Sequence, residues 1–172
     1  MNFSELAQKR YSTRAFTEQM PDDDLINKII EAGRIAPTAR NTQPVLVRVI
    51  KSEIMLAKAK EASPCIYGAP LVFVICYDKS VMCSNPERPG DWYGEMDATI
   101  VTTHMMLAAA DLGLGSCFVE RFDWKAFHDF LELPENIVCC AILPVGYPDP
   151  EKGGPCERHF DRKPTQDFCK VV

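Results

Sequence analysis

The apolar segment LVFVICY, residues 71–77, constrains the fold of this chain more than any other part of the sequence. A strand with one solvent-exposed face alternates apolar and polar residues, whereas this run is apolar throughout. It therefore predicts a strand that is buried on both faces inside a sheet. A second run, IVCCAILPVGY at residues 137–147, predicts another core strand, so the chain needs helices to cover the sheet.

The remaining segments supply further strands and those helices. VLVRVI at residues 45–50 and SCFVE at residues 116–120 are predicted strands. Capping residues and apolar periodicity predict helices over residues 4–9, 22–36, 52–62, 91–113 and 123–131, beginning at Ser4, Asp22, Ser52, Asp91 and Asp123. We expect an α+β fold with a mixed, mainly antiparallel central sheet flanked by helices, formed by residues 1–172 as a single domain.

Composition excludes several classes of protein. A chain of 172 residues that is 47% hydrophobic fits one well-filled core. The net charge of -5, with no run of lysine or arginine, argues against a nucleic-acid surface. The first residues lack the apolar core of a secretory signal, and the apolar region at residues 100–112 is too short to cross a bilayer. We expect a cytoplasmic protein that binds neither nucleic acid nor membrane.

The eight cysteines include no CxxC pair, and several lie inside apolar runs. Free cysteine behaves there as a small hydrophobic residue, and free thiols are expected. A metal site built from Cys156, His159 and Cys169 is disfavoured by its loose spacing and small number of ligands. No metal is expected.

The segment RYSTRAF, residues 10–16, places two arginines and a serine at alternate positions. In extended backbone, Arg10, Ser12 and Arg14 point to one side and present two guanidinium groups and a hydroxyl to a single anion. Phosphate suits such a set because arginine binds its oxygens in a bidentate way. The same pattern also fits an edge strand whose charges discourage aggregation.

Two other segments could contact a ligand. APTARNTQP, residues 36–44, carries Asn41 and Gln43 in a turn bracketed by prolines, and their amides can both donate and accept hydrogen bonds, as the edge of a heteroaromatic ring requires. In DLGLGSCFVERFD, residues 111–123, Gly113 and Gly115 would turn the backbone from a helix into a strand and expose amides at the strand end. Each segment alone also fits a plain structural role, as a helix-terminating turn and as a glycine helix cap.

Together, in this order and spacing, the three segments resemble the nitroreductase family of flavin enzymes. Residues 10–16 are similar to the family's R-x-S-x-R-x-F signature, and residues 36–44 to its A-P-S-A-x-N-x-Q-P loop. The Leu-Gly-Leu-Gly segment at residues 112–115, Phe122-Asp123 and Gly146-Tyr147-Pro148 complete the set. The resemblance covers nearly the whole chain.

The resemblance implies an α+β fold that binds FMN non-covalently at the interface of a homodimer. The flavin phosphate would lie against Arg10, Ser12 and Arg14. A further basic group would come from the C-terminal segment, where Arg162 and Lys163 are the candidates and Arg158 is an alternative. The tail, from about residue 149 to residue 172, is expected to reach the partner subunit.

The resemblance also implies contacts with the flavin ring. Asn41 and Gln43 would meet the isoalloxazine and ribityl groups, residues 37–38 (Pro37 and Thr38) would line the ring, and backbone amides near Glu120 and Arg121 would reach flavin N5. Arg121 stands where the family often has a small residue. The loop at residues 79–90 is short, so the lid over the substrate site is thin or absent. Trp92 or Tyr93 is a candidate to shade the flavin, or simply to pack in the core or at an interface.

Flavin takes up a hydride at N5 and develops negative charge near N1 and O2, so a protein assists by placing donors and positive charge there in advance. No catalytic side chain is expected, and His104, His128 and His159 share no motif. The expected function is an FMN-dependent oxidoreductase that takes hydride from NAD(P)H and passes electrons to a nitroaromatic or quinone by a ping-pong scheme. The alternatives are a flavin-binding storage or redox-sensing protein without efficient turnover, and a cysteine-rich metal-binding protein.

Overall fold

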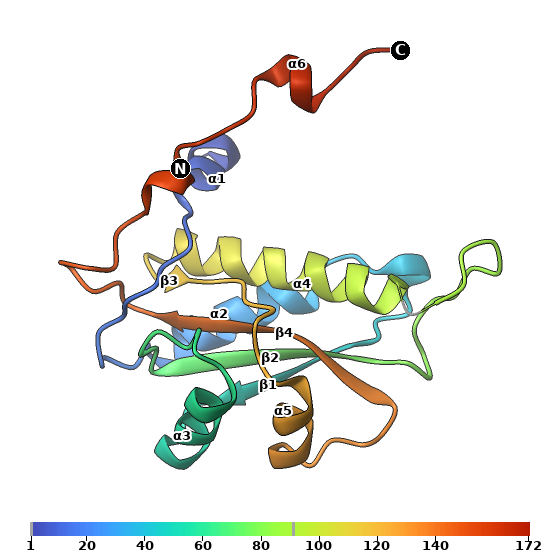
Figure 1. Ribbon diagram of the computed structural model, residues 1–172, viewed down its shortest axis with the longest axis horizontal. Helices are drawn as coiled ribbons and strands as arrows, with labels where there is room; N and C mark the ends of the chain where they lie inside the picture. Colours follow the sequence, from blue (N-terminus) through green and yellow to red (C-terminus); the bar gives the residue numbers. More distant parts are fainter. Residues whose placement is uncertain (1, 91) are drawn as a thin grey trace.

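A computed structural model, which describes residues 2–90 and 92–172, has a four-stranded sheet with helices on both faces (Figure 1). The strands follow the spatial order β1-β2-β4-β3 and pair antiparallel throughout. A parallel bridge between Ser12 and Ser116 adds the N-terminal segment to this sheet. The expected α+β fold with a mainly antiparallel sheet is confirmed. The strands are β1 (Val45–Ile50), β2 (Leu71–Asp78), β3 (Gly115–Ser116) and β4 (Ile137–Gly146).

Strand β2 is buried along both faces, as its apolar sequence predicts. Phe73 and Ile75 pack into one core cluster, whereas Val72 and Val74 pack into the other. Burying each side chain of this size contributes about 1.5–3 kcal/mol. The sheet is therefore held from both sides.

Helices α2 and α4 cover one face of the sheet, and α3 and α5 cover the other (Figure 1). Helix α4 lies close to β2 because Gly94 has no side chain, and a Cβ there would overlap the ring of Tyr77. The helices are α1 (Phe3–Lys9), α2 (Asp23–Arg34), α3 (Glu53–Ala62), α4 (Trp92–Asp111), α5 (Trp124–Phe130) and α6 (Thr165–Phe168), with 3₁₀ turns η1 (Ala39–Asn41) and η2 (Glu157–His159).

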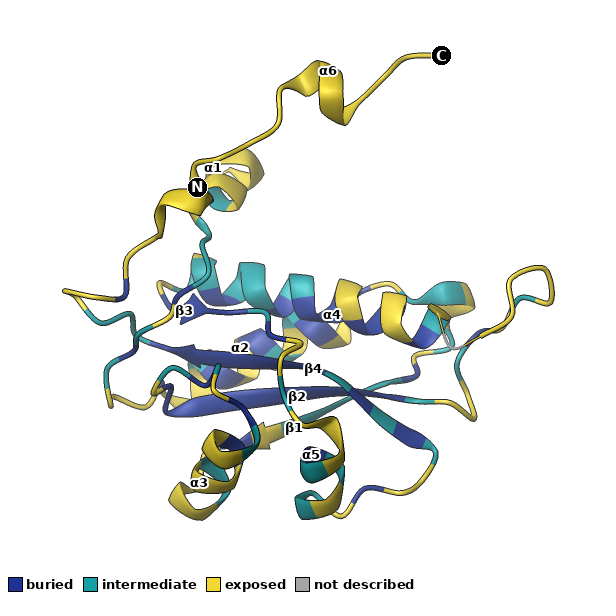
Figure 2. Cartoon of the chain, in the orientation of Figure 1, coloured by how far each residue is buried: buried dark blue, intermediate teal, exposed yellow. Residues whose placement is uncertain are grey.

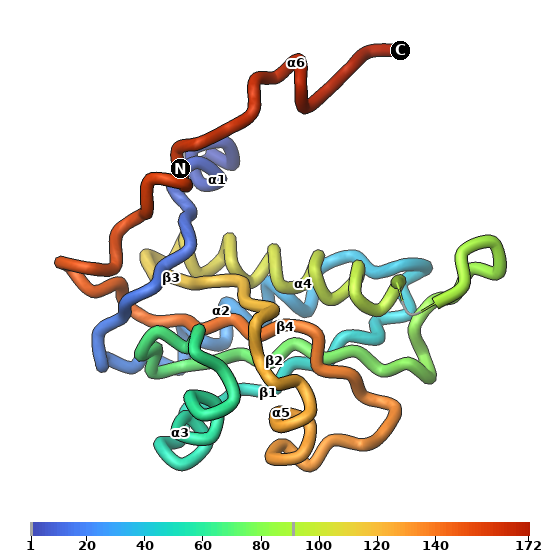
Figure 3. The backbone as a smooth tube through the Cα atoms, in the orientation of Figure 1, coloured from blue at the N-terminus to red at the C-terminus, as the bar shows by residue number. Residues whose placement is uncertain are grey.

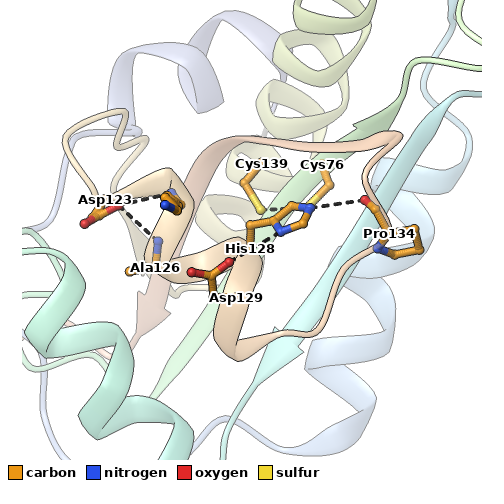
Figure 4. Close-up of polar contacts among 8 residues, drawn as sticks. Cys76, Asp123, Ala126, His128, Asp129, Pro134 and Cys139 are labelled. Atoms are coloured by element: carbon orange, nitrogen blue, oxygen red, sulfur yellow. Dashed lines mark hydrogen bonds and ion pairs between the residues drawn. The ribbon is translucent and has the colours of Figure 1, made fainter.

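Two predicted helix caps are confirmed, and a third is wrong. Ser52 caps α3 and Asp123 caps α5, where the Asp123 carboxylate accepts hydrogen bonds from the amides of Lys125 and Ala126 at 3.1 and 3.0 Å (Figure 4). Helix α1 begins at Phe3 rather than at Ser4. Asn2 caps it because Asn2 and Glu5 form a reciprocal capping box, which satisfies two backbone amides that a Ser4 cap would leave without partners.

Two other boundaries differ from the sequence prediction. The predicted cap Asp91 lies outside the described residues, and α4 ends at Asp111, two residues before Gly113, which adopts a φ of 80°. In place of the predicted strand at residues 116–120, the structure has the two-residue strand β3 and a separate bridge between Val119 and Ile142. Pro144 of β4 explains the interruption: it accepts a hydrogen bond from the Cys117 amide at 3.2 Å but has no N–H to return.

The eight cysteines are free thiols. Cys76 and Cys139 face each other across β2 and β4 with their sulfurs 3.4 Å apart, beside α5 (Figure 4). His128 lies on α5, where its Nε2 is 3.1 Å from the carbonyl oxygen of Pro134 (Figure 4). These groups belong to the core and its edge on the α3–α5 side.

The C-terminal segment leaves the sheet after β4, passes beside α1 and runs outward to the C-terminus (Figure 3). Its side chains are exposed almost throughout (Figure 2), including the apolar residues Phe160 and Phe168. Among residues 2–90 and 92–172, no helix combines the length and apolarity needed to cross a membrane.

Candidate functional site

The arginine motif lies in extended backbone that is fastened to the rim of the sheet. The Thr13 amide donates to the Ser116 carbonyl at 2.9 Å, and Phe16 forms a bridge with Pro148. Because side chains alternate along extended backbone, Thr13 points into the protein and is fully buried, whereas Arg14 is exposed. The expected alternation is therefore present at Thr13 and Arg14.

The C-terminal segment returns to this motif through η2. The Nε2 of His159 lies 3.2 Å from the carbonyl oxygen of Gln8, and the rings of His159 and Tyr11 are 6.1 Å apart in an edge-to-face arrangement. This packing carries Arg158 and Arg162 to the side of the motif.

The two segments enclose a hollow of about 170 Å³, which we call the arginine hollow. It is lined by Arg10, Tyr11, Ser12, Arg14, Cys156, Arg158, His159 and Arg162. The structure therefore brings Arg10, Ser12, Arg14 and Arg162 together and adds Arg158, whereas Lys163 is not among the lining residues.

The four arginines of this hollow form no ion pair with any carboxylate in the described part of the chain. Arg14 instead donates from Nη1 to the Ser12 carbonyl at 3.3 Å and lies 3.6 Å from the Cys156 sulfur. Burial lowers the pKa of Arg10, and the positive charge of Arg162 lowers that pKa further. Guanidinium groups crowded together without counter-charges favour binding of an anion such as phosphate.

A second hollow of about 370 Å³, which we call the edge hollow, lies at the open edge of β4. It is lined by Glu95, Thr99, Phe118, Glu120, Phe122, Trp124 and residues 138–141. Residues 116–120 connect the two hollows, and four residues of chain span at most about 14 Å. Glu120 of the edge hollow and Ser116, which pairs with the arginine motif, therefore lie within the length of one elongated ligand.

Glu120 and Arg121 are both exposed at this end of the segment. Glu120 lines the edge hollow, and the Arg121 carbonyl accepts a hydrogen bond from the Ser63 hydroxyl at 2.8 Å. Within the described residues, neither backbone amide has a hydrogen-bond partner. Two free amides side by side can donate to an acceptor atom of a bound ring.

The loop at residues 36–44, which we call the amide loop, lies elsewhere. The Ala39 amide donates to the Asp97 carboxylate of α4 at 2.8 Å, and the Gln43 amide donates to the Thr38 hydroxyl at 3.0 Å. Asn41 and Gln43 are exposed, with their backbones at φ values of 56° and 50°. Thr38 and Gln43 line a separate hollow of about 320 Å³ between α2, β1 and α4.

The arginine hollow and the amide loop lie at opposite ends of α4. The loop is fastened to Asp97 in the first half of the helix, whereas the arginine motif pairs with Ser116, beyond the C-terminal residue Asp111. The helix rises about 1.5 Å per residue, so Asp97 and Asp111 are about 21 Å apart. One copy of the chain does not bring the two predicted groups of ligand contacts together.

Helix α4 also carries an exposed apolar stripe. Trp92, Met96 and Ile100 repeat every four residues and are 48, 42 and 38% exposed. The guanidinium of Arg88 lies 5.3 Å from the Trp92 ring centroid, and Tyr93 lies within hydrogen-bond distance of Asn85, so both aromatic residues contact the 79–90 loop. Neither lines the arginine hollow or the edge hollow.

Sequence reasoning missed Asp97 and Glu95. The signal for Asp97 was present, because Gly94, Ala98 and Val101 mark the buried face of α4 and place a carboxylate among small apolar residues. Nothing in the sequence distinguished Glu95 from an ordinary solvent-exposed acid.

Comparisons with known proteins bear on the family and fold of this chain. A sequence profile described as the nitroreductase family matches residues 7–64 and 52–147. A protein of Archaeoglobus fulgidus named putative NADH dehydrogenase/NAD(P)H nitroreductase is 32% identical over 150 residues, which cover 83% of each chain.

Solved structures give the same picture. The crystal structure of a nitroreductase family protein from Clostridium difficile 630 superposes with a TM-score of 0.91 at 36% identity, covering 99% of this chain and 98% of the other. A putative nitroreductase from Desulfovibrio desulfuricans, solved in complex with FMN, has a TM-score of 0.82 at 21% identity, covering 100% of this chain and 98% of the other, and shows a shared fold.

Proposed function

The chain belongs to the nitroreductase family of oxidoreductases, and from this premise we propose that it is an FMN-dependent NAD(P)H oxidoreductase. Its second substrate would be a small acceptor such as a nitroaromatic or a quinone. The observation that carries the proposal is the arginine hollow, whose four guanidinium groups have no carboxylate partner among the described residues.

The residues of the hollow fit a flavin phosphate. Arg10 and Arg14 would each supply a charge-assisted hydrogen bond, and Ser12 would add a neutral donor. Arg162 would complete the set from the tail, because it lines the hollow and Lys163 does not. Since the chain as a whole is acidic, this local cluster would also select an anionic ligand over a neutral one.

The ring of the flavin would lie toward the edge hollow. The free amides of Glu120 and Arg121 would donate toward N5 and so help to orient the ring. When bound, FMN supplies the two-electron chemistry, accepting a hydride at N5. The protein's part is to bind and orient the ring and to stabilise negative charge, so we assign no catalytic side chain.

Asn41 and Gln43 would meet the same flavin only from a second copy of the chain. In their own chain the amide loop is fastened to Asp97, which faces the other side of α4 from Glu95 and Thr99 of the edge hollow. We therefore propose a homodimer with FMN at its interface, to which the partner contributes the amide loop with Pro37 and Thr38. The apolar stripe of α4 supports such an interface, since large exposed apolar side chains in a row favour association.

The exposed tail, from about residue 149 to residue 172, would reach the partner subunit with its part beyond Arg162, because Arg158 and Arg162 line the hollow of their own chain. The two ends of the tail would still belong to one single-domain protein. Phe160 and Phe168 are 71 and 84% exposed, and burial of either ring against the partner subunit would stabilise that contact. The cytoplasmic location expected from the sequence is retained, and the free thiols agree with a reducing compartment.

Purified protein provides the test. FMN content would be measured by its absorption spectrum after release, followed by stopped-flow reduction of the bound flavin with NADH and NADPH separately. A panel of nitroaromatics and quinones would then follow reoxidation. We expect flavin reduction by at least one nucleotide and reoxidation by at least one acceptor. Bound FMN that neither nucleotide reduces would contradict the enzyme and favour a storage or redox-sensing protein, and a colourless protein would contradict both.

A further inference from the structure

The amide loop has a backbone conformation that its residues do not favour. Arg40, Asn41 and Gln43 have φ values of 52, 56 and 50°. In this left-handed region the Cβ of any residue other than glycine lies too close to its own backbone. Three such residues within four positions would relax unless other contacts held them.

Few hydrogen bonds fasten the loop to the rest of the protein. Inside it, Thr38 accepts from the amides of Gln43 and Asn41, through its hydroxyl at 3.0 Å and its carbonyl at 2.9 Å. Among the described residues, one hydrogen bond joins residues 37–43 to another element: the Ala39 amide donates to Oδ1 of Asp97 at 2.8 Å. Asp97 therefore joins the loop to the core helix α4.

Asp97 is an unusual residue for its place in the fold. It is 2% exposed on the buried face of α4, and its second oxygen, Oδ2, has no partner in the described part of the chain. Burial raises the pKa of Asp97, and the hydrogen bond from the Ala39 amide offsets only part of this effect. Burying a carboxylate at this site lowers the stability of the fold relative to an apolar residue. The hydrogen bond to the Ala39 amide is the contact in this structure that offsets that loss.

We propose that Asp97 is a positioning residue for the flavin: from inside the core it holds the Ala39 amide and so fixes the turn that presents Asn41 and Gln43. The inference rests on the proposed function, in which those two amides contact FMN. Asp97 itself is too deeply buried to touch the cofactor, so its effect passes through the loop.

Two substitutions of Asp97 separate this role from a general contribution to folding. Asp97→Asn keeps a side-chain oxygen that can accept from Ala39, whereas Asp97→Ala removes it. The matched control is Thr102→Val, because Thr102 is also buried on α4, and its hydroxyl donates at 2.7 Å to Ala98 of the same helix rather than to the loop. Each full-length protein would be measured in two ways: hydrogen exchange of the 36–44 segment without FMN, and the dissociation constant for FMN added back to the apoprotein.

We expect Asp97→Ala to speed exchange in the loop and to raise the dissociation constant for FMN about tenfold. Asp97→Asn should stay close to the parent in both measurements, and Thr102→Val should lower the melting temperature without changing either. Unchanged loop exchange in Asp97→Ala would overturn the inference, as would faster exchange with parental FMN affinity.

A parent protein that binds no FMN would contradict the proposed function and, with it, the flavin part of this inference. The exchange data, which need no cofactor, would still decide whether Asp97 holds the loop.

Discussion

The arginine hollow and the amide loop are held in place by opposite means. The arginine motif is extended and is fixed by main-chain pairing with the sheet. Among the described residues, its arginine side chains form no ion pair with a carboxylate. The amide loop is a tight turn with three positive φ values, and it depends on one buried carboxylate. We therefore expect side chains of the hollow to tolerate substitution without loss of the fold, and the order of the loop to depend on Asp97. About 21 Å of helix lies between Asp97, which holds the loop, and Asp111, at the end of α4 nearer the arginine motif.

The largest expected effect comes from the arginine end. The double substitution Arg10→Ala and Arg14→Ala should leave the fold intact and abolish retention of FMN through purification. Each lost charge-assisted contact is worth about 1.5–3 kcal/mol, or roughly 10- to 150-fold in affinity. The measurement is FMN content per chain, with Lys28→Ala as control because Lys28 pairs with Asp24 on the exposed face of α2. Parental FMN content in the double variant would remove this motif from the flavin site.

The next effect separates two neighbouring basic residues of the tail. Arg162→Ala should weaken FMN binding roughly 10- to 150-fold, because Arg162 lines the arginine hollow. Lys163→Ala should bind FMN like the parent. Fluorescence titration of the apoproteins measures both constants, and the reverse order of effects would mean that the tail is arranged differently in the flavin-bound protein.

A smaller effect is expected at the amide loop. Asn41→Ala and Gln43→Ala each remove neutral hydrogen bonds worth about 0.5–1.5 kcal/mol, so FMN affinity should fall about 2- to 12-fold. Because we propose that these amides face the ring rather than the phosphate, the flavin absorption spectrum or reduction potential should also shift. The arginine variants, loaded with excess FMN, should keep the parental spectrum. If the loop variants lost as much FMN affinity as the arginine variants and showed no spectral change, the assignment of the loop to the ring and the arginines to the phosphate would be wrong.

The smallest expected effect is on the pH dependence of stability. It has opposite signs at Asp149, near the arginine motif, and at Asp97, under the amide loop. Backbone hydrogen bonds from Lys152 and Glu151 lower the pKa of Asp149, beside the arginine motif. That stabilisation is present above the unfolded value of about 3.9 and is lost as pH falls through the lower folded pKa. Burial raises the pKa of Asp97, so its protonation stabilises the fold, and this stability is lost as pH rises through the folded pKa.

Thermal unfolding between pH 3 and 8 checks this prediction. Asp149→Asn should flatten the pH dependence of the melting temperature below about pH 4, and Asp97→Asn should flatten it above that value. The same pH profile in both variants would contradict the opposite signs.

Much of the fold could be predicted from the sequence because its signals are local. The apolar run at residues 71–77 predicts the central strand, and Ser52 and Asp123 cap the helices that they were expected to cap. Errors arose where contacts distant in sequence decide the outcome. The predicted strand at residues 116–120 is interrupted because Pro144, on the facing strand, lacks an N–H.

The candidate site divides in the same way. The alternation of Arg10, Ser12 and Arg14 could be predicted from the sequence, and the structure adds Arg158 and Arg162 from a segment almost 150 positions away. Asp97 could not be assigned a role, because its contact with Ala39 exists only once α4 packs under the loop. The separation of the hollow from the loop could not be predicted either, since it depends on the direction of α4 in the folded chain.

The central claim is that one flavin is held by the arginine hollow of one chain and the amide loop of another. The direct measurement is FMN content in a mixed dimer, made by co-expressing an Arg10→Ala/Arg14→Ala chain with an Asn41→Ala/Gln43→Ala chain under two different affinity tags. A site shared between chains predicts one fully intact site in each mixed dimer, so half of its sites should bind FMN with the parental dissociation constant. A mixed dimer whose sites show only the dissociation constants of the two defective homodimers, with FMN content equal to their mean, would place both groups in the same chain and contradict the account.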